Sequence, residues 1–407
     1  MADKTQQAYA HYQRGVILEQ AGRIAEAVEE YRQALQENPR LRDAHIALAK
    51  YYRRNALLAK AAEAWAAVVA IHPDYEALSS LASAQIELKR FAEARATLQQ
   101  LLRLLPDDAF VIYELAFIDY AEGRFAEALA QLIELRPIYN DEWQLHHLIG
   151  NCQVRLGLYD AAQASFGRAM LLASNDEHIE ELQSSVTMIE RLREFASLSG
   201  RKDWAYAEHG MIYLGSAGDD GLQAAPTESK SWTYPEIATT LRRMIRLAQA
   251  GVWRCSAVLP VNRSADPLAR ALARALSQPV RQPRQLSSGD IALAVVSAVS
   301  DGATLPTIHE YVPCAVVTFA LVLSHQPAPG DTLPDIVGVQ AGTPRLPWEH
   351  AMARAIQAGA TPAELDAILQ DATDQITLAL AALPAEPSEA AQIEYYTVHH
   401  RRLEIPR

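Results

Sequence analysis

A chain of 407 residues is longer than the size at which a single hydrophobic core usually stops growing, so we expect two or three domains. Its formal net charge of −12 argues against nucleic acid or an anionic membrane as the main partner. The cysteines Cys152, Cys255 and Cys314 form no CxxC pair and indicate neither a disulfide framework nor a zinc site. The polar N-terminus and the short apolar runs predict a cytoplasmic protein without a membrane span.

Small residues recur along the first half of the chain at a nearly fixed interval. One series has separations of 34, 33, 34 and 34 residues: Ala27, Ala61, Ala94, Ala128 and Ala162. A second series keeps the same step: Gly15, Ala49, Ala82, Ala116 and Gly150. Larger residues stand four places after each residue of the first series: Tyr31, Trp65, Leu98, Leu132 and Phe166. Such a period predicts stacked pairs of antiparallel helices, with small residues where two helix backbones approach closely.

Glycines and prolines divide the same region into units. Gly22, Gly123 and Gly157 mark turns between paired helices, and Pro39 closes the first unit. The stretch from Ala10 to Pro39, AHYQRGVILEQAGRIAEAVEEYRQALQENP, resembles the tetratricopeptide repeat (TPR) family, and the resemblance extends over residues 5–175. It implies an α-solenoid of five TPR helix pairs that binds other proteins or peptides. An amphipathic stretch within residues 176–200 predicts a capping helix.

Strands and helices alternate after Gly200, where the helical period ends. We expect strands at residues 204–214, 253–261, 291–299, 315–323 and 336–339. We expect helices at residues 236–250, 266–276 and 361–382, the last opened by a threonine and a proline. This alternation predicts an α/β domain with a mainly parallel sheet over residues 201–383. Residues 384–407 are expected to form a flexible tail or a peripheral strand.

Three segments of this second half resemble the type I phosphoribosyltransferase fold. They read AVLPVNRSADPLARALARAL from Ala257, IALAVVSAVSDGATL from Ile291 and CAVVTFALVLSH from Cys314. A later segment, LPDIVGVQAGTPRLPWE, is similar to the "PWE" hood of purine-using members, so the resemblance covers about residues 235–350. It implies two phosphate-binding loops with these residues: Arg263, Ser264, Gly302, Ala303 and Thr304.

The departures from the family pattern predict a domain that has lost catalysis. Val296 and Ser297 stand where two acidic residues normally hold the ribose and the magnesium-bound phosphate, and neither supplies a carboxylate. Ser264 replaces a glycine, and Thr343 replaces the tryptophan that stacks on the base. We therefore expect no catalytic residue, no cofactor and no metal ligand, and at most the docking or sensing of a phosphorylated small molecule.

Two alternatives stay open for this domain. Arg263, Gly302 and Thr304 could equally be ordinary turn residues. The domain could also be an active magnesium-dependent phosphoribosyltransferase of nucleotide salvage, with a TPR extension and with magnesium held in an unfamiliar way. The nearby acids that could compensate are Asp290, Asp301 and Asp335.

The first helix of each repeat is expected to line a concave groove. The candidate groove residues are Tyr12, Lys50, Arg53, Arg54, Phe110, Tyr113, Phe117, Tyr120, His147, Asn151 and Arg155. Aromatic residues beside basic ones would suit an extended peptide with apolar anchors and an acidic group, although the aromatics could instead pack on a neighbouring repeat. In the pair His146–His147, we expect one histidine to face the groove, and a metal site is the less favoured alternative. The function expected is a non-enzymatic interaction scaffold.

Overall fold

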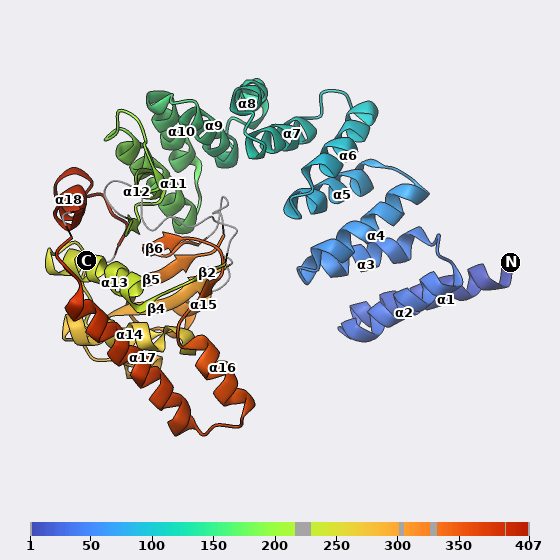
Figure 1. Cartoon of the computed structure of the whole chain (residues 1–407). Coiled ribbons are helices and arrows are strands. Elements are labelled where there is room, and N and C mark those ends of the chain that lie inside the picture. The colour runs from blue at the N-terminus through green and yellow to red at the C-terminus, as the bar shows by residue number, and fades with distance from the viewer. Residues whose placement is uncertain (1, 216–228, 301–304, 326–331, 387, 406–407) are drawn as a thin grey trace. The chain divides into compact units, whose positions relative to one another are not determined.

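The computed structural model describes residues 2–215, 229–300, 305–325, 332–386 and 388–405. The chain divides into two compact units, Met1–Gln183 and Ser184–Arg407. The first unit is entirely helical in the part described, whereas the second combines helices with a β-sheet (Figure 1). The change of composition that the sequence shows near Gly200 therefore accompanies a change of architecture.

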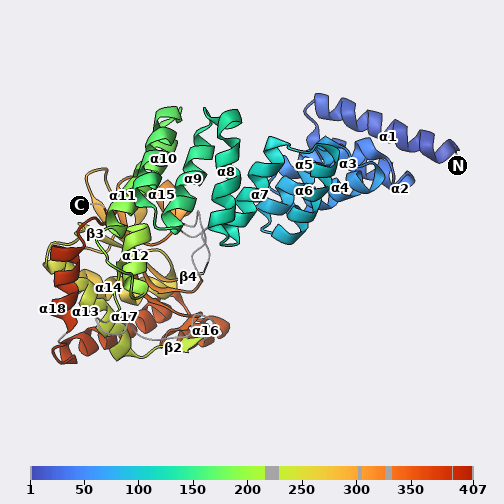
Figure 2. The ribbon, with the colours of Figure 1, turned by 90° about the horizontal axis from the view of Figure 1, so that it is seen from above.

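The first unit consists of five consecutive helix pairs (Figures 1 and 2). They are α1 (Ala2–Gln20) with α2 (Ile24–Glu37), α3 (Arg42–Arg54) with α4 (Leu58–Ile71), α5 (Tyr75–Glu87) with α6 (Phe91–Leu104), α7 (Ala109–Ala121) with α8 (Phe125–Tyr139), and α9 (Trp143–Arg155) with α10 (Tyr159–Leu172). Each of α2, α4 and α6 ends two residues before a proline, because proline cannot donate the backbone hydrogen bond that would continue the helix.

The predicted close contacts between paired helices are present in the structure. Both series of small residues are buried in all five repeats. A Cβ atom added to Gly15 would lie 2.5 Å from the ring of Tyr31. In the fifth repeat, Gly150 lies against Phe166 in the same way. Gly15 and Gly150 are therefore required at their contacts with Tyr31 and Phe166, since core packing leaves no room for a further atom. The second repeat differs, because Ala49 shares its cluster with Trp65.

The turn inside every repeat contains a residue with a left-handed backbone. Three repeats use Gly22, Gly123 and Gly157, with φ of 75°, 82° and 73°. Ala56 and Lys89 occupy the same place in the second and third repeats with φ of 54° and 57°. The left-handed conformation costs a residue with a Cβ atom about 1–2 kcal/mol of conformational energy, so these two turns are strained.

Polar pairs inside repeats three to five follow the same period and are not among the predicted contacts. In each pair a side chain near the end of the first helix bonds one on the second helix. The pairs are Thr97 to Gln85 at 2.9 Å, Gln131 to Asp119 at 2.6 Å and Ser165 to Gln153 at 2.8 Å. Successive pairs are 34 residues apart, a spacing that could have revealed them.

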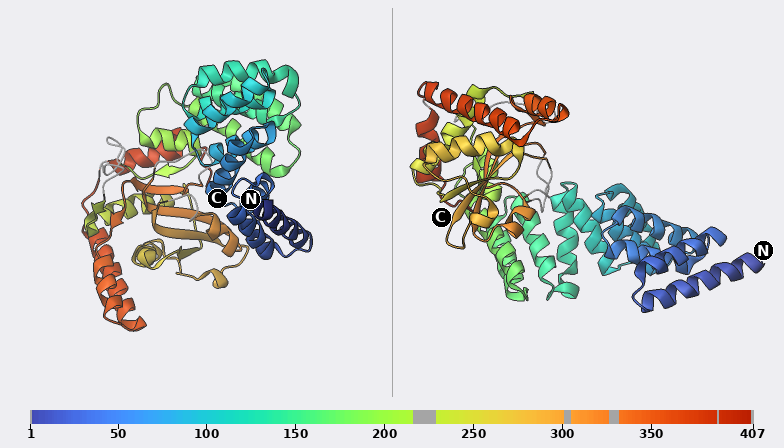
Figure 3. Two further views of the ribbon diagram at one scale, coloured as in Figure 1. Left: turned by 90° about the vertical axis from the view of Figure 1, so that its right-hand side faces the viewer. Right: turned by 90° about the horizontal axis from the view of Figure 1, so that it is seen from below.

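In the residues that the structure describes, the second unit is built around five parallel strands in the order β1-β6-β5-β4-β3. The strands are β1 (Ile212–Tyr213), β3 (Ala257–Pro260), β4 (Ile291–Val299), β5 (Ala315–Leu323) and β6 (Ile336–Gln340). The orange strands of this sheet, among them β4, β5 and β6, lie side by side in the left view of Figure 3. A small second sheet pairs β2 (Lys230–Ser231) with β7 (Pro344–Arg345). The parallel sheet expected from the sequence is confirmed.

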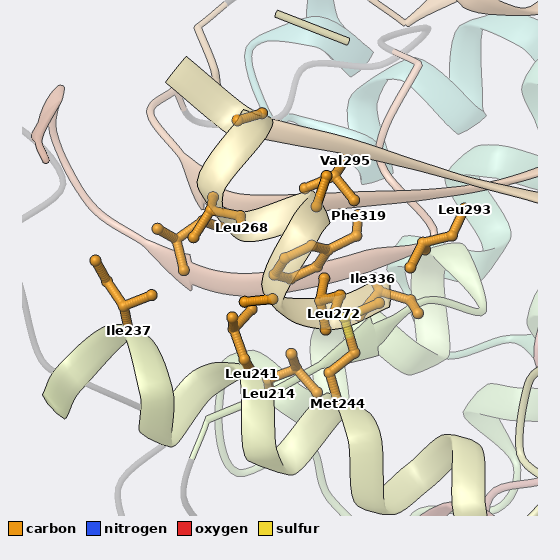
Figure 4. Packing of buried hydrophobic residues seen from close by; sticks show 14 of the residues in the cluster. Leu214, Ile237, Leu241, Met244, Leu268, Leu272, Leu293, Val295, Phe319 and Ile336 are labelled. Carbon is orange, nitrogen blue, oxygen red and sulfur yellow. The ribbon is translucent and has the colours of Figure 1, made fainter. Parts of the chain in front are cut away.

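Helices pack on both faces of the five-stranded sheet, so its strands are apolar on both sides. One face meets α13 (Tyr234–Gln249), α14 (Asp266–Leu276) and α17 (Pro362–Ala382). The other meets α15 (Pro306–Tyr311). Figure 4 shows Leu241 and Met244 of α13, Leu272 of α14 and Phe319 of β5 converging in the core. Along β4 the side chains alternate, with Leu293 and Val295 on the first face.

One expected strand of the second unit is wrong. Residues 204–209 belong to the helix α12 (Arg201–His209), and the strand β1 contains only residues 212–213 of the expected range. Gly210 has φ of 62° and caps the end of α12. Gly210 interrupts the expected strand because its own backbone is left-handed, as is typical of the residue that follows the end of an α-helix.

The expectation of a flexible or strand-like tail is also corrected. Residues 388–394 form α18 (Ser388–Glu394), and a π-helical turn follows at Tyr395–His399. The backbone N–H of Tyr213 donates to the Tyr396 hydroxyl at 2.9 Å, and that hydroxyl donates to the Tyr213 carbonyl at 3.2 Å. Tyr396 is buried, so the tail is part of the core of the second unit.

The helix after the last repeat contributes to both units. This helix, α11, spans Asp176–Leu192, and the boundary between the units falls within it. In its first half, His178 lies 4.2 Å from Trp143 of α9, measured between ring centres. In its second half, the buried Arg191 donates to the carbonyl of Ala207 at 3.1 Å and pairs with Glu404 at 2.8 Å.

Two helices directly follow the small second sheet near the end of the second unit. After β7 the chain forms α16 (Glu349–Gln357), which precedes α17. Thr361 caps α17 and exchanges hydrogen bonds with Glu364 in a capping box. The threonine start of this helix is therefore confirmed.

Candidate peptide-binding groove

The basic candidates on α3 all have acidic partners. Three ion pairs join them to neighbouring helices: Lys50 to Glu76 at 3.0 Å, Arg53 to Glu87 at 4.0 Å and Arg54 to Glu19 at 2.7 Å. Their side chains stay more than half exposed, so each pair is worth little to stability. The positive charges of Lys50, Arg53 and Arg54, which were expected to bind an acidic group of a peptide, are therefore neutralised by acidic residues of the array itself.

Tyr12 packs inside the first repeat. Its ring centre lies 5.9 Å from that of Tyr9 and 5.9 Å from that of Tyr31. Burial raises the pKa of Tyr12, and the nearby Asp43 adds to the effect. The side chain remains half-buried, so its ring supports the packing of α1 on α2.

The four aromatic candidates on α7 fall into two groups. Phe117 and Tyr120 pack against buried residues of repeats four and five, including Leu132. Phe110 and Tyr113 are also half-buried, but both line an open cavity of about 260 Å³. The alternative of packing within the array therefore describes all four rings, since Tyr113 packs on the same buried cluster as Phe117 and Tyr120, and Phe110 packs on the neighbouring one. Phe110 and Tyr113 differ because they also line the cavity.

This cavity, which we call the acidic pocket, combines aromatic and acidic groups. Its lining residues are Phe110, Tyr113, Glu114, Tyr139, Glu142, Gln144 and Leu145. Burial, together with repulsion from Glu87, raises the pKa of Glu114 to about 7. Burial and the charge of Glu114 raise the pKa of Tyr113 to about 12. The pocket therefore favours a positively charged occupant.

The two acidic residues of α7, Asp119 and Glu114, differ in whether their carboxylates have hydrogen-bonding partners. Asp119 receives hydrogen bonds from Arg95 at 2.8 Å, Arg124 at 3.0 Å and Gln131 at 2.6 Å. Burial alone would raise its pKa, but these bonds lower it. Among the residues that the structure describes, Glu114 has no hydrogen bond or ion pair.

Sequence reasoning missed Glu114 and Glu142 as candidate site residues. The available signal is the composition of α7, AFVIYELAFIDYA, in which every residue other than Glu114 and Asp119 is apolar or aromatic. An acidic residue within such an apolar helix needs a partner or a function. Glu142 stands at the N-cap of α9 and makes no capping hydrogen bond there.

The adjacent histidines of α9 have different surroundings. His146 is buried, and its Nε2 lies 2.9 Å from the carbonyl oxygen of Asn140. His147 stacks on Trp143 with ring centres 5.8 Å apart, and its Nδ1 lies 3.7 Å from Glu181. Burial lowers the pKa of His147, while Glu181 acts in the opposite direction.

The last two candidates on α9 differ in exposure. Asn151 is half-buried, and Arg155 is exposed in the last turn of the helix. Neither lines the acidic pocket. The groove candidates are therefore spread over α1, α3, α7 and α9, and the acidic pocket contains only Phe110 and Tyr113 of the predicted set.

The expected phosphate loops of the second unit can be followed only in part. Gly302, Ala303 and Thr304 lie outside the described residues. Arg263 is exposed after β3 and lines a cavity of about 340 Å³ between α14 and α17. Ser264 donates its hydroxyl hydrogen bond to Glu349, and its carbonyl accepts one from Trp348 at 3.1 Å. Ser264 is thus tied to the start of α16.

The described ranges hold neither a metal cluster nor a membrane-spanning helix. They contain no group of three or more histidine, cysteine or acidic side chains arranged to hold a metal ion. Within the same residues, every helix is too short or too polar to cross a bilayer.

Comparison with protein families agrees with the helix-pair architecture. Residues 8–41, 85–149 and 144–176 each match a family model described as tetratricopeptide repeat. The N-terminal half is a TPR array. The matched segments include α7, α8 and α9, and so they include every residue of the acidic pocket.

Several solved TPR structures are similar to this TPR array. YrrB, described as a TPR protein with an unusual peptide-binding site, is 14% identical, with a TM-score of 0.38 over 42% of this chain and 90% of its own. MamA is 22% identical, with a TM-score of 0.38 over 42% of this chain and 93% of its own. A TPR protein from Parabacteroides merdae is 18% identical, with a TM-score of 0.38 over 49% of this chain and 77% of its own. No curated protein sequence matches the chain.

Proposed function

We propose that the protein is a non-enzymatic scaffold whose TPR array binds a partner protein or peptide along the first helices of its repeats. The acidic pocket is the observation that carries this proposal, because it leaves Phe110 and Tyr113 open beside a carboxylate that has no partner in the described part of the chain. Aromatic residues in pockets are frequent anchors at protein interfaces. TPR proteins generally bind proteins or peptides, which supports the same conclusion.

Affinity purification with quantitative mass spectrometry tests this function. The full-length protein is compared with a Phe110→Ala, Tyr113→Ala double variant in extracts of the cells that encode it. A matched control is Ile133→Ala, an exposed apolar residue of α8 outside the pocket. We expect a specific partner to be lost from the double variant and retained by the control. Equal recovery of every specific partner by all three proteins would place the binding site elsewhere.

For the second unit we keep the phosphoribosyltransferase-like fold, without catalysis, as a proposal. The parallel sheet agrees with it, and Val296, where the resemblance places an acid, is a buried apolar residue within β4. Calorimetry with phosphoribosyl pyrophosphate and magnesium tests both versions of the proposal. Binding without turnover would support a docking or sensing domain, whereas base-dependent turnover would support the active transferase of nucleotide salvage. The absence of binding would remove both.

A further inference from the structure

The acidic pocket holds a negative charge that the described part of the protein does not neutralise. Glu114 lies in the apolar helix α7 without a hydrogen-bonding or ion-pairing partner among the described residues. Glu142 lines the same cavity, and Glu87 lies close enough to repel the Glu114 carboxylate. A half-buried carboxylate without a partner is stabilised by a cation that enters the cavity.

We propose that the acidic pocket binds the side chain of a lysine or arginine from a partner peptide, with Glu114 as the anionic partner of the basic group. This inference rests on the proposed function, because it assumes that the TPR array binds a peptide. It also revises the chemistry expected from the sequence, in which the peptide carried an acidic group. The basic residues that suggested an acidic peptide, Lys50, Arg53 and Arg54, already have acidic partners.

The walls and the size of the pocket suit a long basic side chain. Phe110, Tyr113 and Tyr139 supply aromatic rings, and Leu145 supplies an aliphatic wall. Lysine and arginine can pack their methylene stems on such surfaces while the charged end reaches a carboxylate. Aromatic rings also attract cations through their faces. The volume of about 260 Å³ is below the roughly 300–1,000 Å³ of sites for drug-sized ligands, as expected for one side chain.

The charge pattern of the array points the same way. Residues 101–183, which contain the pocket, include fourteen acidic and five basic residues. Residues 1–100 include twelve acidic and thirteen basic residues. The excess negative charge is therefore concentrated in the last part of the array, where it would attract a basic segment of a partner.

Binding of a basic side chain should depend on pH through Glu114. The groups around its carboxylate are Tyr113 from α7, Tyr139 at the end of α8, Glu142 before α9 and Glu87 from α5, which is itself paired with Arg53 at 4.0 Å. None of the residues that line the pocket is cationic, and the pKa of free Glu114 is about 7. Protonation of Glu114 removes the charge that a basic group requires, so affinity should fall as pH decreases below about 7.

The test starts from a library of random peptides displayed on phage, selected on the full-length protein at about pH 8, where Glu114 is ionised. A selected peptide and its analogue with glutamine in place of the basic residue are then titrated by fluorescence polarisation. The protein variants are Glu114→Gln, which keeps the side-chain shape, and Glu134→Gln, which removes one exposed charge from α8 outside the pocket. Circular dichroism confirms that both variants are folded.

We expect selected peptides to share a lysine or arginine, and Glu114→Gln to weaken their binding about tenfold or more while Glu134→Gln changes it little. The glutamine analogue should bind wild type and Glu114→Gln equally weakly, and only wild type should lose affinity on acidification. Selected peptides without a basic residue, or equal affinity of wild type and Glu114→Gln, would overturn the inference while leaving the scaffold function intact. A library without any binder would contradict the scaffold function itself, and the inference with it.

Discussion

Gly150 and Phe166 lie in direct contact across the two helices of the fifth repeat, so that a Cβ atom on the glycine would overlap the ring. The same relationship joins Gly15 to Tyr31 in the first repeat. In repeats three and four, alanines face leucines at the equivalent positions: Ala82 with Leu98 and Ala116 with Leu132. In these four repeats a glycine accompanies an aromatic residue and an alanine accompanies a leucine, as expected if the two side chains fill one volume. The second repeat combines Ala49 with Trp65 instead.

The first prediction follows from this shared volume. Gly150→Ala should lower the free energy of unfolding of the TPR array by about 1–3 kcal/mol, because the added methyl group overpacks the contact with Phe166. Adding Phe166→Leu should recover part of this loss by restoring the alanine–leucine combination. Urea unfolding followed by circular dichroism measures both changes.

The control for this prediction is Gly167→Ala. Gly167 belongs to α10, and a Cβ atom added there meets nothing within 4 Å. Alanine favours a helix over glycine by about 1 kcal/mol, so this variant should be as stable as wild type or more stable. A loss in Gly167→Ala as large as in Gly150→Ala would show that overpacking is not the cause.

The second prediction concerns the strained turns of repeats two and three. Ala56→Gly and Lys89→Gly should each raise the free energy of unfolding by about 0.5–1 kcal/mol, since glycine adopts a positive φ without the Cβ penalty and loses part of the gain to chain entropy. Thermal unfolding of the two variants provides the measurement. The reverse change, Gly22→Ala at φ of 75°, should destabilise, and an unchanged melting temperature in all three would contradict the strain.

The third prediction is a pH dependence of stability caused by Glu114. Its pKa is about 7 in the folded protein, against an ordinary value of 4.5, so the folded state binds more protons between these two values. Stability therefore falls as pH rises from about 4.5 to about 7, by about 3 kcal/mol at most. Glu114→Gln should lack this fall and be more stable than wild type at about pH 8. Urea unfolding of both proteins at about pH 5 and about pH 8 tests this prediction. If the free energy of unfolding changes equally with pH in wild type and Glu114→Gln, the pKa of Glu114 is not raised.

The fourth prediction tests the role of the C-terminal residues in the second unit. Tyr396→Phe removes the hydroxyl that satisfies both backbone groups of Tyr213. Because these groups are buried, the change should cost about 1–3 kcal/mol of stability. Tyr311→Phe, at a residue whose side chain is largely exposed, is the control and should cost little. Equal stability of both variants would show that the tail is not an essential part of the core.

Hydrogen exchange offers a second measurement for the same contact. The amide hydrogen of Tyr213 should be strongly protected in wild type, since it is buried and bonded to the Tyr396 hydroxyl. In Tyr396→Phe that protection should decrease more than the protection of amides in the middle of β4.

Local sequence patterns predict several elements of the second unit with their observed bounds. α14 at Asp266–Leu276, β4 at Ile291–Val299 and β5 at Ala315–Leu323 agree with the sequence expectation. Each has a strong pattern, either a helical period or a continuous apolar run. Residues 204–214 are the exception, because Gly210 is compatible both with a break in a strand and with a helix cap. Only its backbone conformation distinguishes the two.

The candidate site is predicted less completely than the fold. The sequence identifies Phe110 and Tyr113 as candidates, but it does not separate them from Phe117 and Tyr120, which pack in the array without lining the pocket. It misses Glu114 because an acidic residue in a helix usually faces solvent or a partner. Asp119 on the same helix does have such partners. The difference between the two carboxylates depends on side chains from other helices and loops, some of them distant in sequence.

The sequence alone determined the repeat architecture, because the spacing of small and large residues every 33 or 34 positions is a consequence of helix contacts that each repeat must satisfy. It also determined the alternation of strand and helix that produces a parallel sheet. Tertiary structure alone decided which charges are neutralised, which aromatic rings remain open and where the C-terminal residues pack. These properties depend on the distances between side chains of different helices, and a one-dimensional pattern does not contain those distances.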